Sequence, residues 1–309
     1  MNWYVMGVDL GSTTAKATVV DYSGALVGSS VVQMGAVSRD AVRRAMDAAL
    51  TAAGVEQTDI RRTISTGYGR KLVPGADRSF TEITCHARGA AALHPGVRLV
   101  IDIGGQDSKV IAVDSDGLVD RFAMNDRCAS GTGRFFDVLA RALEVDVSEV
   151  GDLALAGADG LEVSSMCATF AETEVISLLA QGQEKADVAA SVHKAVAVRT
   201  LGLVAQVGKA TPTVMTGGVA RNPAARHYVE KALRHPIELL DQPQIAGAYG
   251  AGLLARDEYA GSIAATETRD VAAKNQLVDR AAGIVPQCTG CDGMAGDHSH
   301  TTIPLTVRS

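Results

Sequence analysis

Short apolar runs near the N-terminus are followed by a longer segment with apolar residues every three or four positions. The runs at 4–9, 16–20 and 25–33 predict three strands, because they are short, rich in Val and bounded by Gly-containing turns. The segment 39–53 has the spacing of an amphipathic helix, with Ser38 placed to cap it. The chain therefore opens with strand, turn, strand, strand and helix.

The same order returns about a hundred residues later. Apolar runs at 98–103, 108–113 and 118–124 predict three more strands, and 131–143 predicts the helix that follows. In both units a polar turn containing glycine comes directly after the first strand. Because the order and the turn are shared, the sequence predicts a duplicated α/β domain.

The remaining segments are mostly helical. Further helices are expected at 84–93, 168–180, 187–207, 223–233 and 245–259, and short strands at 62–65 and 213–215. The regular pattern weakens from about residue 260. We therefore predict a first subdomain at 1–95, a second at 96–259 and an irregular extension at 260–309.

Composition narrows the classes of function. The chain has 309 residues, a net charge of −6 and 4% aromatic residues, which disfavours binding to nucleic acid. The apolar run at 3–10 is interrupted by Asp9, is too short to cross a bilayer and lacks the features of a signal peptide. A cytoplasmic protein without a membrane segment is the expectation. The odd count of five cysteines argues against a disulfide framework.

The first polar turn has residues suited to a phosphate. Asp9 ends the first strand and can hold a water on Mg²⁺. Backbone amides, hydroxyls and one ammonium group can donate to phosphate oxygens. These donors belong to Gly11, Ser12, Thr13, Thr14 and Lys16. An ordinary hairpin turn is an equally weighted alternative for this motif alone.

The second turn mirrors the first. Asp102 ends its strand and is predicted to act at the metal, Gly104 and Gly105 follow, and Gln106 and Asp107 are candidates to orient the attacking water. Two such turns from two half-domains can clamp one triphosphate between them.

A third turn joins a short strand to a helix at 216–222. Its Gly217 and Gly218 allow a flat adenosine to lie against the backbone. The order and separation of all three turns carry more weight than any one of them. The sequence has neither a Walker A motif nor a G-x-G-x-x-G after its first strand, which disfavours the P-loop and Rossmann folds.

Two cysteines, Cys128 and Cys167, each precede a predicted helix. A helix N-terminus lowers the pKa of a thiol and favours the thiolate. A four-iron cluster takes four thiolates, which a twofold dimer of this chain would supply. Zinc is an alternative, and two unrelated half-buried cysteines are favoured on these residues alone.

Seven strings over residues 4–256 carry a close resemblance: MGVDLGSTTAK, TGYGR, CHARGA, VIDIGGQDSKV, NDRCASGTGRFFDVLA, CATFAETEVISLLAQG and TGGVARN. They resemble the BadF/BadG/BcrA/BcrD-type ATPases, which are activators of 2-hydroxyacyl-CoA dehydratases and ATPase subunits of benzoyl-CoA reductases. The resemblance implies the actin/Hsp70/sugar-kinase fold with a nucleotide cleft between two similar subdomains. It also implies ATP hydrolysis and one [4Fe–4S] cluster per dimer.

The resemblance assigns roles to individual residues. Cys128 and Cys167 would be the cluster ligands, whereas Cys85 would not be one. Gln244 would reach the nucleotide near Gly217 and Gly218. Contacts to the phosphates are implied for Ser12, Thr13, Thr14 and Lys16. Binding of Mg²⁺ or of water is implied for Asp9, Asp102 and Asp107.

The family resemblance also implies partners. These are an identical or similar second chain, a reductase or dehydratase with its own iron–sulfur clusters, and a ferredoxin or flavodoxin as electron donor. ATP hydrolysis would drive a low-potential electron into the partner. The Ala-rich composition and the extension beyond residue 260 favour, slightly, the ATPase component of a benzoyl-CoA reductase over a dehydratase activator.

Two other classes stay open. A small-molecule kinase of the same fold would lack the cluster, and so would a nucleotide sensor that binds ATP without electron transfer. In the extension, Cys288 and Cys291 followed by His298 and His300 resemble a metal-binding pattern, but incidental thiols in a terminal segment are favoured.

Overall fold

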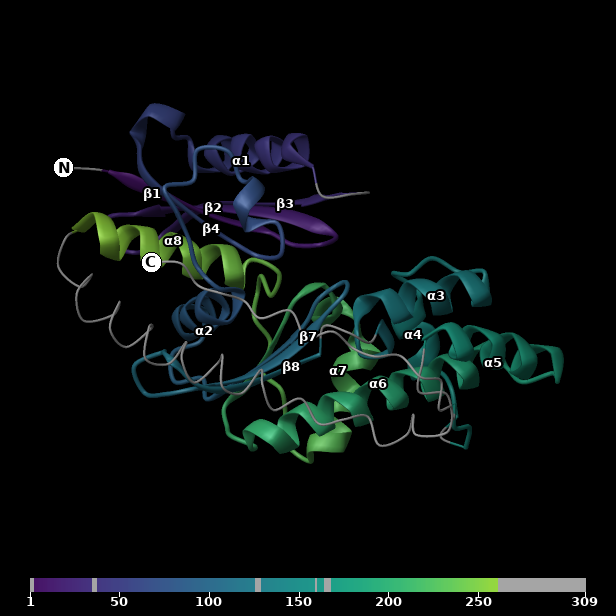
Figure 1. The fold of residues 1–309 in the computed structure, drawn as a ribbon. Coiled ribbons are helices and arrows are strands. Elements are labelled where there is room, and N and C mark those ends of the chain that lie inside the picture. The colour runs from purple at the N-terminus through teal and green to yellow at the C-terminus, as the bar shows by residue number, and fades with distance from the viewer. Residues whose placement is uncertain (1–2, 35–37, 126–128, 159, 164–167, 261–309) are drawn as a thin grey trace, which may run out of the picture.

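The computed structural model describes residues 3–34, 38–125, 129–158, 160–163 and 168–260. Two sheets with helices on both sides form the described chain (Figure 1). The first sheet has the order β3-β2-β1-β4-β5. Its strands are β1 (Tyr4–Leu10), β2 (Thr14–Asp21), β3 (Leu26–Gln33), β4 (Ile60–Thr66) and β5 (Arg78–Ser79).

The second sheet repeats this arrangement with the order β8-β7-β6-β9. Its strands are β6 (Leu99–Ile103), β7 (Ser108–Val113), β8 (Val119–Asn125) and β9 (Thr213–Thr216). In each sheet the first strand pairs antiparallel with the second and parallel with a later strand. The predicted duplication is therefore confirmed, and β1 and β6 hold equivalent positions.

Helix α1 (Arg39–Ala53) covers the outer side of the first sheet. The helix begins where the sequence predicts, because the backbone amide of Ala41 donates to Ser38 Oγ at 3.1 Å. It ends at Gly54, which adopts a left-handed conformation. Its buried face is apolar and packs mainly against β2 and β3.

Two helices form the layer between the sheets, α2 (Glu82–Leu93) and α8 (Ala246–Ala260) (Figure 1). They cross at two glycines: a Cβ on Gly89 would meet the backbone amide nitrogen of Gly250 at 2.9 Å. Helix α8 packs against β1, β2 and β4, although it comes from the end of the described chain. The helix that covers the inner side of the first sheet therefore comes from the far end of the described chain. The predicted subdomain boundary near residue 96 stays a prediction.

The other helices lie around the second sheet. They are α3 (Gly133–Leu143), α4 (Val150–Leu155), α5 (Ala168–Ala180), α6 (Lys185–Val207) and α7 (Pro223–Leu233). Helix α6 is long and apolar enough to cross a membrane by length and composition, but 56% of its most apolar window is buried inside the protein. It contacts α4, α7, β7 and β8, as a core helix does.

The sequence pattern misplaced or missed several short elements. Helix α3 begins at Gly133 and not at 131, because Ala129–Gly131 form a 3₁₀ turn and Thr132 is extended. The pattern did not predict α4 or β5, which have only six and two residues. Elements this short show too little periodicity to be recognised.

His193 on α6 is fully buried in the second half of the molecule. Its Nδ1 lies 2.7 Å from the carbonyl oxygen of Ala189, and its Nε2 lies 3.0 Å from Nδ2 of Asn222. The ring also packs on Phe136 of α3, with the centroids 4.6 Å apart. Burial lowers the pKa of His193 to about 4, because the charged form loses its hydration.

This histidine predicts an acid dependence of stability. Between pH 6.5 and about 4 the unfolded chain binds a proton at His193 that the folded chain does not. The free energy of unfolding should fall over this window by up to about 3 kcal/mol, at roughly 1.4 kcal/mol per pKa unit. Urea unfolding at several pH values measures the loss. His193→Gln should flatten this part of the profile, and an unchanged slope in that variant would disprove the assignment.

Candidate functional site

The fold brings the first two predicted turns into contact. They join β1 to β2 and β6 to β7, and so they lie at equivalent edges of the two sheets. A Cβ on Gly105 would sit 2.0 Å from Oγ1 of Thr13 and 3.5 Å from Oγ of Ser12. A larger residue at position 105 would have to displace the Thr13 side chain, so the two turns lie in contact and form one surface.

Asp9 lies beneath the first turn and is 2% exposed. Lys16, its neighbour across the β1–β2 pair, donates from Nζ to Asp9 Oδ2 at 3.0 Å. The other oxygen, Oδ1, is buried and has no hydrogen-bond partner in the described chain. A buried carboxylate oxygen without a donor is costly unless a cation or a water completes it, so this atom fits a Mg²⁺-bound water.

Asp102 is the equivalent residue in the second half, and both of its oxygens are occupied. The hydroxyl of Thr216 donates to Oδ1 at 2.8 Å, and Nζ of Lys109 donates to Oδ2 at 3.2 Å. Nδ1 of His86 lies 3.5 Å from Oδ1. Burial by itself would raise the pKa of Asp102, but His86, Lys109 and Thr216 outweigh it and hold the pKa well below its usual value.

Lys109 lies among three carboxylates in the part of the site that the second sheet provides. Its side chain is 1% exposed and contacts Asp107 at 2.8 Å as well as Asp102, with Glu82 at 3.7 Å. Burial would lower the pKa of Lys109, but these three carboxylates raise it above its usual value. The pKa of Glu82 is itself raised by burial, which Lys109 only partly offsets. Lys109 is therefore charged and neutralises its neighbours.

The third turn closes the site from the end of β9. The backbone amide of Gly217 donates to the carbonyl oxygen of Pro243 at 3.1 Å, which brings in the segment before α8. A Cβ on Gly218 would lie 3.7 Å from Nε2 of Gln244. Arg221 also donates to Oε1 of Gln244 at 3.4 Å. Gly217, Gly218 and Gln244, which are distant in sequence, are therefore neighbours.

The predicted nucleotide-binding residues differ in how far they are exposed to solvent. Thr13, Gln106 and Gly218 are exposed, Gly11, Ser12 and Gly104 are half-buried, and Thr14 is buried. Within the described ranges no three His, Cys, Asp or Glu side chains are arranged to hold a metal directly. A Mg²⁺ ion held mainly through phosphate oxygens and waters, which this ion prefers, would not need such a group.

Four residues of the site were missing from the sequence prediction: Lys109, Glu82, His86 and Thr216. A signal for Lys109 existed, because it follows Asp102 by seven residues, as Lys16 follows Asp9. Glu82 and His86 are four residues apart and share one face of α2. Their sequence carries no such signal, since only the packing of α2 between the sheets brings Glu82 to Lys109 and His86 to Asp102.

The second turn also contacts the start of α3. The backbone amides of Gly133 and Arg134 donate to the carbonyl oxygens of Gly104 and Gly105, both at 2.8 Å. Cys128 and Cys167, the predicted metal ligands, lie outside the described residues. Helix α5 begins at Ala168, directly after Cys167, and the 3₁₀ turn Ala129–Gly131 directly after Cys128. Cys85 is buried in α2, and burial raises its pKa to about 12.

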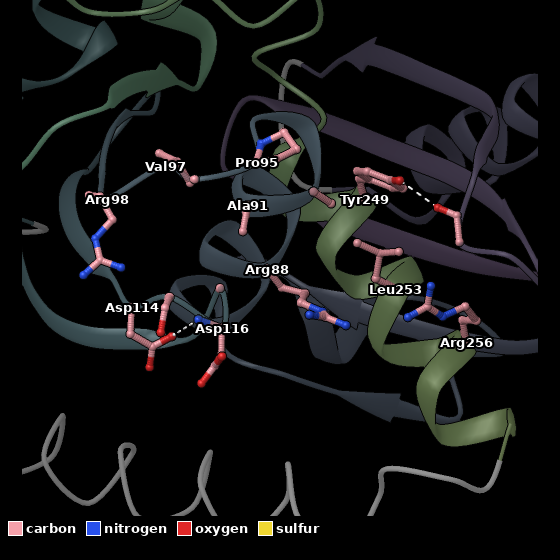
Figure 2. A pocket seen from close by; sticks show the side chains of 15 residues that line it. Arg88, Ala91, Pro95, Val97, Arg98, Asp114, Asp116, Tyr249, Leu253 and Arg256 are labelled. Carbon is pink, nitrogen blue, oxygen red and sulfur yellow. Dashed lines mark hydrogen bonds between the residues drawn. The ribbon is translucent and has the colours of Figure 1, made fainter.

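A separate hollow of about 380 Å³ lies at the opposite strand ends (Figure 2). It is lined by α2, α8 and the turns that follow β2 and β7. The hydroxyl of Tyr249 donates to the carbonyl oxygen of Gly24 across it, at 2.7 Å. None of the predicted nucleotide residues lines this hollow.

Two equivalent sheets, two facing turns with buried aspartates and a third glycine turn define the class: this is an actin/Hsp70/sugar-kinase fold. Solved structures at 16–17% identity share the fold, among them the ethanolamine utilization protein EutJ from Carboxydothermus hydrogenoformans and a ROK family glucokinase from Streptomyces griseus. Their TM-scores are 0.55 and 0.51.

The chain belongs to the BadF/BadG/BcrA/BcrD ATPase family, whose profile matches residues 6–255. It is 42% identical over 256 residues to the (R)-2-hydroxyglutaryl-CoA dehydratase activating ATPase of Acidaminococcus fermentans, covering 82% of this chain and 98% of that protein. The crystal structure of component A of that dehydratase has a TM-score of 0.80 and covers 84% of this chain and 99% of its own. The family expected from the sequence is confirmed.

Other relatives include both dehydratase activators and a benzoyl-CoA reductase component, and their identities to this chain differ. The activator of lactoyl-CoA dehydratase of Anaerotignum propionicum is 42% identical over 82% of this chain and 97% of its own. A polypeptide of the benzoyl-CoA reductase of Thauera aromatica is 30% identical, over 80% and 91%. The similarity therefore favours the dehydratase activators, and the slight preference for a reductase component, which came from composition, is not supported.

Proposed function

We propose that this protein is the ATP-hydrolysing activator of a 2-hydroxyacyl-CoA dehydratase and delivers one low-potential electron to that partner enzyme. The observation that carries the proposal is the pair of facing turns with Asp9 and Asp102 beneath them, in a chain 40–42% identical to three dehydratase activators. A small-molecule kinase is less well supported, because its likeness to this chain is limited to the fold.

In this proposal the first two turns hold the phosphates and the third holds the adenosine. Ser12, Thr13, Thr14 and Lys16 donate to phosphate oxygens, Asp9 completes the Mg²⁺ shell through water, and Asp107 with Gln106 orients the attacking water. Lys109 contacts both Asp102 and Asp107, and it is among the groups that hold the pKa of Asp102 low, so Asp102 is ionised at neutral pH, as phosphoryl transfer through Mg²⁺ requires. Gln244 lies with Gly217 and Gly218 on the adenosine side.

The predicted cluster ligands, Cys128 and Cys167, would be shared with a second copy or a similar chain. A bound [4Fe–4S] cluster supplies one-electron chemistry. The described residues support a link between the turn and these cysteines, because Gly104 and Gly105 accept hydrogen bonds from the first residues of α3. A change at the phosphate turn would therefore reach the segment just after Cys128.

Anaerobic purification tests this function. The full chain should be brown, contain about four irons per dimer and hydrolyse Mg-ATP. With a chemical reductant it should activate a 2-hydroxyacyl-CoA dehydratase more effectively than it supports a benzoyl-CoA reductase. Colourless, iron-free protein that phosphorylates a small molecule would instead establish the kinase alternative.

Cysteine variants separate the two activities. Cys128→Ser and Cys167→Ser should each lose iron and electron transfer while binding ATP normally, since serine is a poor ligand for this cluster. Cys85→Ser is the matched control, because Cys85 is buried in α2 and this variant is expected to keep its iron content. Full electron transfer by either ligand variant would refute the assignment.

A further inference from the structure

Helix α2 enters the site from between the two sheets, and His86 lies in its first turns, 4% exposed. Its Nδ1 lies 3.5 Å from both Asp102 Oδ1 and Thr216 Oγ1. The other side of the ring faces α8: a Cβ on Gly247 would lie 2.8 Å from Nε2 of His86 and 3.1 Å from Oδ2 of Asp9. The ring thus sits between the two aspartates, one from each sheet.

The two halves of the site differ at this point. Thr66 and Thr216 hold equivalent positions, opposite Asp9 and Asp102 in the strand registers. Thr66 donates to the carbonyl oxygen of Phe80 and leaves Asp9 Oδ1 without a partner, whereas Thr216 donates to Asp102. His86 adds a second group beside Asp102 Oδ1. One carboxylate is therefore fixed and the other has an open oxygen.

We infer that His86 is a positioning residue for ATP hydrolysis, which holds the Asp102 carboxylate by donating from Nδ1 to Oδ1. This inference rests on the proposed function, because it names a further residue of the same ATP site. A distance of 3.5 Å is long for a hydrogen bond, and such bonds in unliganded sites shorten when the substrate binds.

Steady-state phosphate release from Mg-ATP by the full chain tests the inference. His86→Phe keeps the ring volume but cannot donate, and kcat should fall about 10-fold while KM for ATP changes less than about 3-fold. His86→Gln retains an N–H donor and should recover most of the rate. A role limited to packing would show the reverse order, with Phe tolerated better than Gln.

A second variant removes the donor and the ring together. His86→Leu cannot donate either and should lower kcat to a similar extent as His86→Phe. This variant decides the question if His86→Phe does not fold. His227→Gln is the control, since His227 is exposed on α7 and lies outside the site.

The outcomes separate the two proposals. Normal kcat in folded His86→Phe, or in folded His86→Leu, would overturn the role of His86 while the ATPase function stands. Absence of ATP hydrolysis by the unchanged chain would overturn the proposed function and this inference with it.

Discussion

Asp9→Asn is expected to lower kcat for ATP hydrolysis by about 100- to 1,000-fold, the size of effect seen when one preorganised group that stabilises charge in a transition state is removed. The reason is local. Asp9 is 2% exposed, Lys16 occupies one carboxylate oxygen, and the other oxygen has no donor in the described chain. An amide at this position keeps the shape but loses the charge that, in the proposed function, holds a Mg²⁺-bound water.

Phosphate release at saturating Mg-ATP measures the effect, and circular dichroism checks that the variant is folded. Asp21→Asn is the matched control. Asp21 lies at the other end of β2, where its Oδ1 accepts from the backbone amides of Ser23 and Ala25, and an amide oxygen can still accept these bonds, although more weakly. The control should stay within about twofold of the original rate. A rate within threefold for Asp9→Asn would remove Asp9 from the metal site.

Lys109→Met is expected to destabilise the fold by roughly 3–5 kcal/mol, the range for removing one partner from a buried ion pair. Methionine fills a similar volume, but Asp102, Asp107 and Glu82 then lose their common counter-charge. The pKa of Asp102 should rise in the variant, since Lys109 is among the groups that hold it down.

Urea unfolding of both proteins at pH 7 measures this loss. Lys16→Met offers a comparison at the equivalent position of the first half. Lys16 is more exposed, at 13%, and contacts one carboxylate, so its removal should cost clearly less. Equal losses for the two lysines, or a loss below about 1 kcal/mol for Lys109→Met, would show that the three-carboxylate contact does not stabilise the fold.

Local pattern determined much of the fold. Short apolar runs located β1–β3 and β6–β8, and the repeated glycine-containing turns indicated the duplication, because each signal depends only on residues that are close in sequence. Ser38 marked the start of α1 for the same reason, since a cap is a contact over three residues. The residues of the three turns marked them as a candidate site before any contact between them was known, and the family strings added the roles of individual residues.

Tertiary structure decided the parts that depend on distant pairs. It placed α8 on the first sheet, with Gly7 against Ala248 and Gly252, and it set α2 between the sheets so that Glu82 and His86 reach the second half. It also made Asp9 and Asp102 unequal, although their sequence surroundings match. The spacing of apolar residues along a helix or strand indicates which side of that element is buried, but it does not indicate which other element covers that side. These contacts are therefore decided only when the elements pack together.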